Sequence, residues 1–239
     1  MGRLPPGALY ALVVLFAINL VNFFDRQLIG GLGEGIRREL GLSDTALGLL
    51  GTVFTLLYAV FGLPLGRLSD TTERRRLLVG GVFFWSLLTA ASGIARNFGQ
   101  LVAARLAVGV GEATCSPAST SLIGDFFPTN LRGRAVAIWM LGLPIGLGLA
   151  NGTGGWMLQH WGWRNAFYVA AVPGLLCAVA ALAMREPQRG AAEAHAVGAR
   201  RRDGSPFMLV LSIPTMWWVI ASGALHNFNM YALGAFIAP

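Results

Sequence analysis

The stretch Arg105-Leu-Ala-Val-Gly109-Val-Gly111-Glu112 decides the interpretation of this chain. It lies in an apolar run from Gln100 to Phe127, which is long enough to cross a bilayer because about 20 residues suffice. On a helix, Arg105, Gly109 and Glu112 share one face. A charge at the centre of a membrane helix costs roughly 2.5–3.5 kcal/mol, so such groups normally face a bundle interior or an aqueous cavity. Two interpretations are open: a structural ion pair, and a substrate or proton site, which we favour.

The composition predicts a protein that crosses the membrane several times. Of 239 residues, 55% are hydrophobic and 12% are charged, whereas soluble domains carry about 25% charged residues. All 18 basic residues are Arg, and they cluster between apolar runs, which is a topology signal and not a nucleic-acid footprint. Cys115 and Cys177 lie in apolar runs without the Cys/His spacing of a metal site. We expect no nucleic-acid partner, no metal and no cofactor.

The apolar runs predict an all-α polytopic membrane protein with a six-helix bundle, a linker and a seventh helix. Ser43 and Asp44 form a plausible N-cap for the second helix, and glycines from Gly30 to Gly35 are expected to loosen the chain after the first. The predicted helices are about residues 8–28 or beyond, 45–68, 77–95, 100–127, 135–158, 166–184 and one that begins near residue 207.

This pattern divides the chain into a transmembrane domain (1–184), a cytoplasmic linker (185–206) and a seventh helix (207–239). A seventh helix alone would have no neighbour to pack against. We therefore expect residues 207–239 to be the start of a truncated C-terminal half.

Arginine positions predict the orientation. With a cytoplasmic N-terminus, the outer segments hold only Arg37, Arg38, Arg96 and Arg164, and the inner segments hold most of the others. Because Lys and Arg are retained on the cytoplasmic side, the N-terminus is expected inside, in the plasma (inner) membrane.

Two motifs resemble signatures of the major facilitator superfamily. Gly66-Arg-Leu68-Ser-Asp70-Thr-Thr-Glu73-Arg74-Arg75 is similar to the loop between helices 2 and 3, although Thr71 and Glu73 depart from the usual Arg and Gly. Arg105-x-x-x-Gly109-x-Gly111-Glu112 resembles the helix 4 signature. The resemblance implies two six-helix halves, each built of two inverted three-helix repeats, and alternating access.

Further motifs resemble the Spinster-like group of that superfamily. They are Asp25-Arg26, Gly111-Glu112-Ala113 and Ser119-x-x-Leu122-Ile-Gly-Asp125. The resemblance implies proton-linked movement of lysolipid or sphingoid-phosphate cargo.

The first helix of each three-helix repeat is expected to line the cavity. Helices 1 and 4 carry buried acid–base pairs there, and helix 7 carries polar side chains. We expect Glu112 and Asp25 to carry the proton, although Asp25 and Arg26 could instead lie at the outer end of helix 1. The residues expected to bind substrate are Arg26, Arg105, Asn22, His226, Asn227, Asn229 and Tyr231.

The loop between helices 2 and 3 is the candidate for a cytoplasmic gate. We assign Asp70, Arg74 and Arg75 to it, with Asp125 at the inner end of helix 4 as a partner. The alternative is that these are ordinary positive-inside charges.

These features predict a secondary transporter, proton-coupled, that moves an amphipathic or organic anion of lysolipid or sphingoid-phosphate type. Alternatives are a proton symporter of small organic or sugar acids, and a receptor or assembly protein that transports nothing. An enzyme is not expected, because no nucleophile–base set accompanies the carboxylates. The expected partners are a small-molecule or lipid-like substrate, protons and the bilayer, and the protein is expected to be a monomer.

Overall fold

The computed structural model describes residues 4–192 and 211–237, and side chains as far as residue 225. The chain divides into two units, Met1–Ala196 and Val197–Pro239. The described part of the second unit is one helix, α9 (Pro214–Ile237). The helices of the first unit are α1 (Ala8–Leu40), α2 (Asp44–Thr71), α3 (Arg74–Ser92), α4 (Phe98–Glu112), α5 (Cys115–Phe126), α6 (Thr129–Met140) and α7 (Gly142–Leu182).

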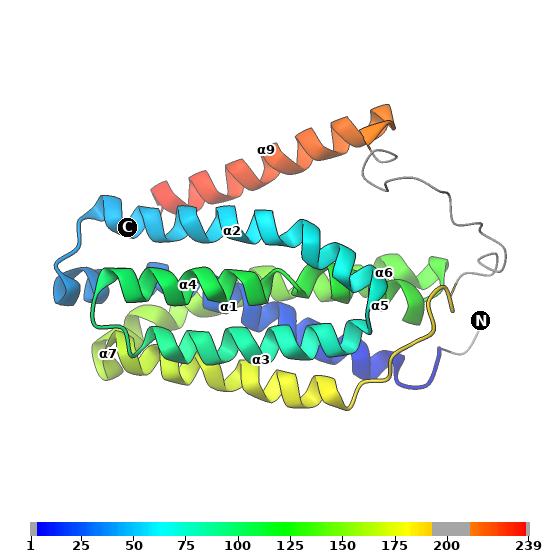
Figure 1. Cartoon of the computed structure of the whole chain (residues 1–239), viewed down its shortest axis with the longest axis horizontal. Coiled ribbons are helices and arrows are strands. Elements are labelled where there is room, and N and C mark those ends of the chain that lie inside the picture. Colours follow the sequence, from blue (N-terminus) through cyan, green and yellow to red (C-terminus); the bar gives the residue numbers. More distant parts are fainter. Residues whose placement is uncertain (1–3, 193–210, 238–239) are drawn as a thin grey trace. The chain divides into compact units, whose positions relative to one another are not determined.

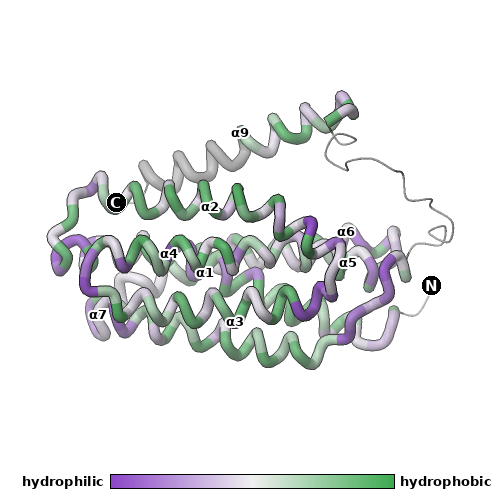
Figure 2. The backbone as a smooth tube through the Cα atoms, viewed as in Figure 1, coloured by the Kyte–Doolittle hydropathy of each residue, from purple (hydrophilic) through white to green (hydrophobic). Residues whose placement is uncertain are grey.

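The described residues contain no strand, so the all-α fold is confirmed. In the first unit the helices lie alongside one another in a bundle (Figure 1). Three described segments are long and apolar enough to cross a membrane: Ala8–Leu40, Asp44–Thr71 and Thr129–Leu182. Hydrophobic residues run along these helices, and hydrophilic residues gather towards the ends of the bundle (Figure 2).

The first helix does not loosen after residue 28, as the glycines had suggested. It continues to Leu40 and ends at Gly41, which takes the left-handed conformation with φ 64°. The glycines remain helical because they serve packing: a Cβ on Gly31 would lie 3.0 Å from the Cα of Gly154. Asp25 and Arg26 are therefore in the interior of α1, and the alternative that they lie at its outer end is wrong.

The predicted fourth helix is interrupted. It forms α4 and α5, which are separated by Ala113 and Thr114. Pro117 has no N–H to donate to the carbonyl of Ala113, which weakens the helix at that turn. The hydroxyl of Thr114 donates to the carbonyl of Gly111 at 2.8 Å and occupies an acceptor at the break.

The predicted fifth and sixth helices also differ from expectation. The fifth begins at Thr129 and breaks at Leu141, before Pro144. Its remainder and the sixth helix form α7, whose two arms (142–161 and 163–182) meet at Gly162 with φ 72° and ψ 162°. Only glycine adopts this backbone conformation without strain, so Gly162 permits the sharp change of direction between the arms (Figure 1).

Glycines also set the contact between α1 and the first arm of α7. Gly142 lies against Asn19 and Leu20, and Gly154 lies against Gly31. Small residues allow helices to approach closely in lipid. Since residue numbers rise together along this contact, α1 and the first arm of α7 run parallel, and the central turns of α1 lie beside this arm.

Candidate functional site

Two ion pairs join α1 to α4 inside the bundle. Arg26 donates from Nε to Oε2 of Glu112 at 2.7 Å. Arg105 lies with Nη1 3.4 Å from Oδ2 of Asp25. The sequence predicted that these four charges converge. It grouped them within each helix, whereas the structure pairs each acid with the arginine of the other helix.

The pair of Asp25 and Arg105 is enclosed. Their side chains are 2% and 1% exposed. Thr89 of α3 donates to Oδ2 of Asp25 at 2.7 Å, and Arg105 also donates from Nη2 to the backbone carbonyl of Asp25 at 3.4 Å. This pair therefore joins α1, α3 and α4, and the surface that Arg105 needs for substrate binding is covered in this conformation.

The pair of Arg26 and Glu112 is different. The Arg26 side chain is 13% exposed, whereas that of Glu112 is fully enclosed. Nη2 of Arg26 and Oε1 of Glu112 have no hydrogen-bond partner among the described residues. Both atoms are buried, so an opening of the site would give an anion an unused donor on Arg26 and a proton an unused oxygen on Glu112.

Aromatic rings surround the guanidinium of Arg26. Its Cζ lies 4.0 Å from the ring centroid of Tyr58, 5.2 Å from that of Phe23 and 5.5 Å from that of Phe54. The Phe54 ring also lies 5.6 Å from Cζ of Arg105. Such contacts stabilise a cation by about 0.5–2 kcal/mol. Phe54 and Tyr58 were not predicted from the sequence, where their signal is an aromatic pair four residues apart on α2.

Of the other predicted substrate residues, only Asn22 has a side chain that the structure describes. Asn22, one turn before Arg26, is buried, and its Nδ2 has no hydrogen-bond partner among the described residues. The side chains of His226, Asn227, Asn229 and Tyr231 lie outside the described residues, although α9 includes their backbone. Their role stays a prediction.

The predicted gate residue Arg74 lies in a buried polar cluster at the start of α3. It is 1% exposed and pairs with Asp125 at the end of α5, as the hypothesis for Asp125 requires. It also donates to Oε1 of Glu186 at 2.7 Å and to the carbonyl of Pro187 at 2.9 Å. The backbone N–H of Gly190 donates to the second oxygen of Asp125 at 2.9 Å.

Two further residues of this Arg74 cluster were missed because the sequence placed them in a linker. Glu186 accepts the backbone N–H of Arg75 at 2.8 Å. Arg189 donates to the carbonyls of Ser69 and Thr72 at 2.7 and 2.6 Å. Predicted gate residue Asp70 is exposed and makes no ion pair or hydrogen bond within the described part of the chain.

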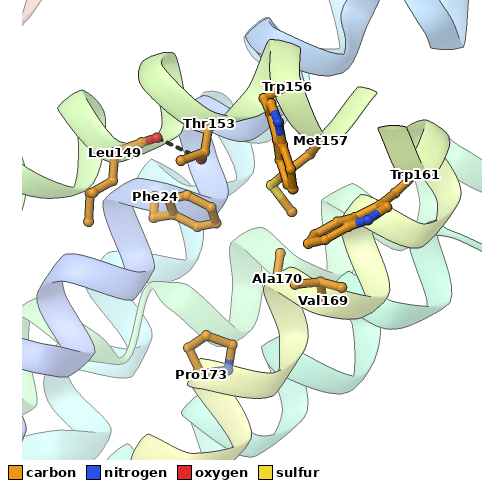
Figure 3. Close-up of a pocket in the computed structure, with 9 residues that line it drawn as sticks. All are labelled: Phe24, Leu149, Thr153, Trp156, Met157, Trp161, Val169, Ala170 and Pro173. Atoms are coloured by element: carbon orange, nitrogen blue, oxygen red, sulfur yellow. Dashed lines mark hydrogen bonds between the residues drawn. The ribbon is translucent and has the colours of Figure 1, made fainter. Parts of the chain in front are cut away.

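One cavity of about 340 Å³ lies between α1 and the two arms of α7 (Figure 3). Its lining is apolar except for Thr153, whose hydroxyl donates to the carbonyl of Leu149 at 2.7 Å. Phe24 forms one wall, and Phe24 and Arg26 are separated by about 200° around α1. No predicted site residue lines this cavity, so it is not the predicted anion site. The lining residues are Phe24, Leu149, Thr153, Trp156, Met157, Trp161, Val169, Ala170 and Pro173.

Comparison with known proteins places this architecture in a family. The sequence pattern of the Major Facilitator Superfamily matches residues 15–239. The probable L-galactonate transporter of Escherichia coli K12 is 37% identical over 71% of this chain and 37% of its own length. Human protein spinster homolog 1 is 36% identical over 98% of this chain and 43% of its own length.

A solved structure agrees with these relatives. The bacterial homolog of the human lysosomal transporter Spinster, inward-facing and unoccupied, superposes with a TM-score of 0.73 at 30% identity. The match covers 87% of this chain and 48% of that one. Our chain thus spans less than half the length of the relatives it matches. It is an integral membrane protein of the Major Facilitator Superfamily, a family of transporters and not of enzymes, and within that family it is Spinster-like.

Proposed function

We propose that this chain forms the N-terminal half of a proton-coupled secondary transporter that moves an amphipathic anion by alternating access. The observation that carries the proposal is the pair of Arg26 and Glu112. It lies inside a membrane bundle, one partner is partly exposed, and each partner keeps one unpaired polar atom.

Charge balance links the anion to the proton. With Glu112 ionised, Arg26 is neutralised by Glu112. With Glu112 protonated, Arg26 is available to an anion, and the site is neutral again. An anion without the proton, or a proton without the anion, leaves a net charge in the membrane, which is costly. Only the empty and the doubly loaded site are neutral, so anion and proton move together.

The pair of Asp25 and Arg105 supports this site in the proposal. Removing one member of a buried pair leaves an uncompensated charge, so the pair holds α1 against α4. For Asp25 to exchange a proton, or for Arg105 to bind substrate, α1 and α4 would first have to separate.

The surroundings of Arg26 bear on the class of substrate. Rings of Phe23, Phe54 and Tyr58 next to the guanidinium favour an anion with an apolar portion, such as a lysolipid or a sphingoid phosphate. A second candidate is a sugar acid, which the 37% identity to the probable L-galactonate transporter favours.

The Arg74 cluster is proposed as the cytoplasmic gate. Asp125 and Glu186 hold Arg74 from α5 and from the segment after α7. This proposal places the N-terminus and the Arg74 cluster on the cytoplasmic side of the plasma membrane, in a protein that works as a monomer.

Uptake into proteoliposomes tests the function. The protein is expressed from its full natural reading frame, and uptake of sphingosine 1-phosphate and L-galactonate is measured with and without a pH gradient. We expect Arg26→Met to weaken binding of the transported probe by about 10–100-fold, since a hydrogen bond to a charged group contributes about 1.5–3 kcal/mol. Glu112→Gln should bind the probe but no longer accumulate it in response to the pH gradient.

The control is Glu34→Gln, which removes an exposed carboxylate of α1 that pairs with Arg37 and Arg38. It should transport as the wild type does. A Glu112→Gln protein that accumulates the probe as fully as the control would overturn the proton-coupling role.

A further inference from the structure

A polar contact between α1 and α7 was not expected from the sequence. Gln27 donates from Nε2 to Oδ1 of Asn151 at 3.0 Å. Gln27 is half-buried and Asn151 is exposed, although both lie in segments apolar enough to cross a membrane. Oε1 of Gln27 and Nδ2 of Asn151 make no hydrogen bond within the described residues. The pair therefore presents one free acceptor and one free donor.

Gln27 and Asn151 lie next to Phe23, one of the aromatic residues around Arg26. The ring of Phe23 lies under the Arg26 guanidinium, with 5.2 Å from Cζ to its centroid. Phe23 also packs against Gly146 of α7, where an added Cβ would lie 3.1 Å from Cβ of Phe23. Gln27 is one turn after Phe23 and shares its face. Neighbouring side chains thus lead from Arg26 through Phe23 to Gln27 and Asn151.

The surface of α7 around Asn151 is open. A Cβ added to Gly148, Gly152 or Gly155 would meet no atom within 4 Å. These glycines flank Asn151 at spacings that place them on its side of the helix. The Asn151 side chain is itself exposed, so its amide is accessible from this side of the helix.

We propose that Gln27 and Asn151 bind a hydroxyl group of the transported anion, beside the charge held by Arg26. The inference rests on the proposed transport function and deepens it, because it names the class of substrate as a hydroxyl-bearing anion. A hydroxyl group both accepts and donates, so it can accept from Nδ2 of Asn151 and donate to Oε1 of Gln27.

The competing explanation is that the pair only joins two helices, since polar side chains hydrogen-bond across helices in membranes. The two explanations differ in what a substitution changes. A helix contact affects stability and all substrates alike, whereas a hydroxyl-binding pair affects only ligands that carry the hydroxyl.

Binding to the protein from its full natural reading frame separates the two. The probes are sphingosine 1-phosphate with its 3-deoxy analogue, which keeps the amino group, and L-galactonate with hexanoate, so that each hydroxylated anion has a partner of the same chain length without hydroxyl groups. We expect Asn151→Leu to weaken binding of the hydroxylated probe about tenfold, for whichever of the two probe sets the protein binds. The hydroxyl-free member should change less than twofold, and Asn151→Ser should restore part of the difference.

Thr153→Val is the matched control on the same helix. Its hydroxyl bonds to its own helix at Leu149, and its side chain lines the apolar cavity on the other side of the α1 contact. This variant should leave both probes unchanged. Equal weakening of both probes by Asn151→Leu, or no weakening of either, would overturn the hydroxyl site alone. A wild-type protein that binds none of the probes would overturn the proposed function and this inference with it.

Discussion

Arg26 and Arg105 are chemically identical, yet their surroundings differ. Arg105 is 1% exposed and faces a carboxylate that Thr89 also binds. Arg26 is 13% exposed, has a free donor and lies among three aromatic rings. We therefore expect substitutions in the Asp25–Arg105 pair to affect mainly stability, and substitutions in the Arg26–Glu112 pair to affect mainly transport.

Loss of one enclosed charge should destabilise the bundle. Asp25→Asn leaves Arg105 without its counter-charge, and we expect a loss of about 3–5 kcal/mol in the free energy of unfolding in detergent. Replacing both partners, as in Asp25→Leu with Arg105→Met, should recover much of this loss because no uncompensated charge remains. The account fails here if Asp25→Asn unfolds no more easily than Glu34→Gln, which changes only exposed ion pairs.

The Tyr58 ring should matter more than its hydroxyl. Tyr58→Leu removes the ring that lies 4.0 Å from the Arg26 guanidinium, and we expect anion affinity to fall about tenfold, since a cation–π contact stabilises by about 0.5–2 kcal/mol. Tyr58→Phe keeps the ring and should bind within twofold of the wild type. Calorimetric titration of both variants measures this, and equal losses in the two would assign the effect to the hydroxyl group.

Helix contacts explain why the ends and breaks of the elements differed from prediction. Apolar runs predicted the all-α fold correctly, since hydropathy does not depend on tertiary contacts. Glycines at 30–35 suggested an early end to the first helix, but α1 continues to Leu40 because packing against α7 stabilises those turns. Breaks near Pro117 and Pro144 follow from prolines visible in the sequence, and the prediction gave them too little weight.

The site was predictable only in part, for a related reason. Charges in an apolar run are visible in a sequence, so Asp25, Arg26, Arg105 and Glu112 were found. Their cross-pairing depends on the register of α1 against α4, which no local pattern encodes. Tyr58, Asn151 and Glu186 join the candidate site and the proposed gate only through contacts with distant segments, and they were missed.

Close approach of α1 and α7 gives a prediction at this level. Gly146→Val places a side chain against the backbone of Leu20 and Phe24, and we expect overpacking to cost about 1–3 kcal/mol of unfolding free energy. Gly148→Ala is the control, because its Cβ meets nothing within 4 Å and alanine favours the helix. Thermal unfolding of both proteins compares them, and equal melting temperatures would show that the close contact does not form.

For the molecule as a whole, alternating access requires each end of the bundle to close and open. The Arg74 cluster joins the start of α3, the end of α5 and the segment after α7. Glu186 and Arg189 tie this segment to the proposed gate by their hydrogen bonds, although the sequence suggested only a linker. Asp70, which is exposed, takes no part in the cluster in this conformation.

Weakening the Arg74 cluster should open the end of the bundle at which this cluster lies. In a Cys115→Ala, Cys177→Ala background, a cysteine at the buried Ser69 position reports access by its rate of labelling with a membrane-impermeant maleimide. Asp125→Asn with Glu186→Gln should raise this rate severalfold, because Arg74 loses both charged partners. Asp70→Asn should leave it unchanged. The gate assignment is wrong if the double variant labels no faster than the Asp70 variant, and transport unchanged by charge reversal at Asp70 would exclude Asp70 from the gate.

The central claim is that an anion and the Glu112 carboxylate compete for Arg26. The most direct measurement is the number of protons taken up when the anion binds to the purified protein in weakly buffered detergent solution, followed with a pH indicator. The wild type should take up about one proton per singly charged anion, and Glu112→Gln should bind the anion without proton uptake. Proton uptake that persists in Glu112→Gln would contradict the account and place the coupling group elsewhere.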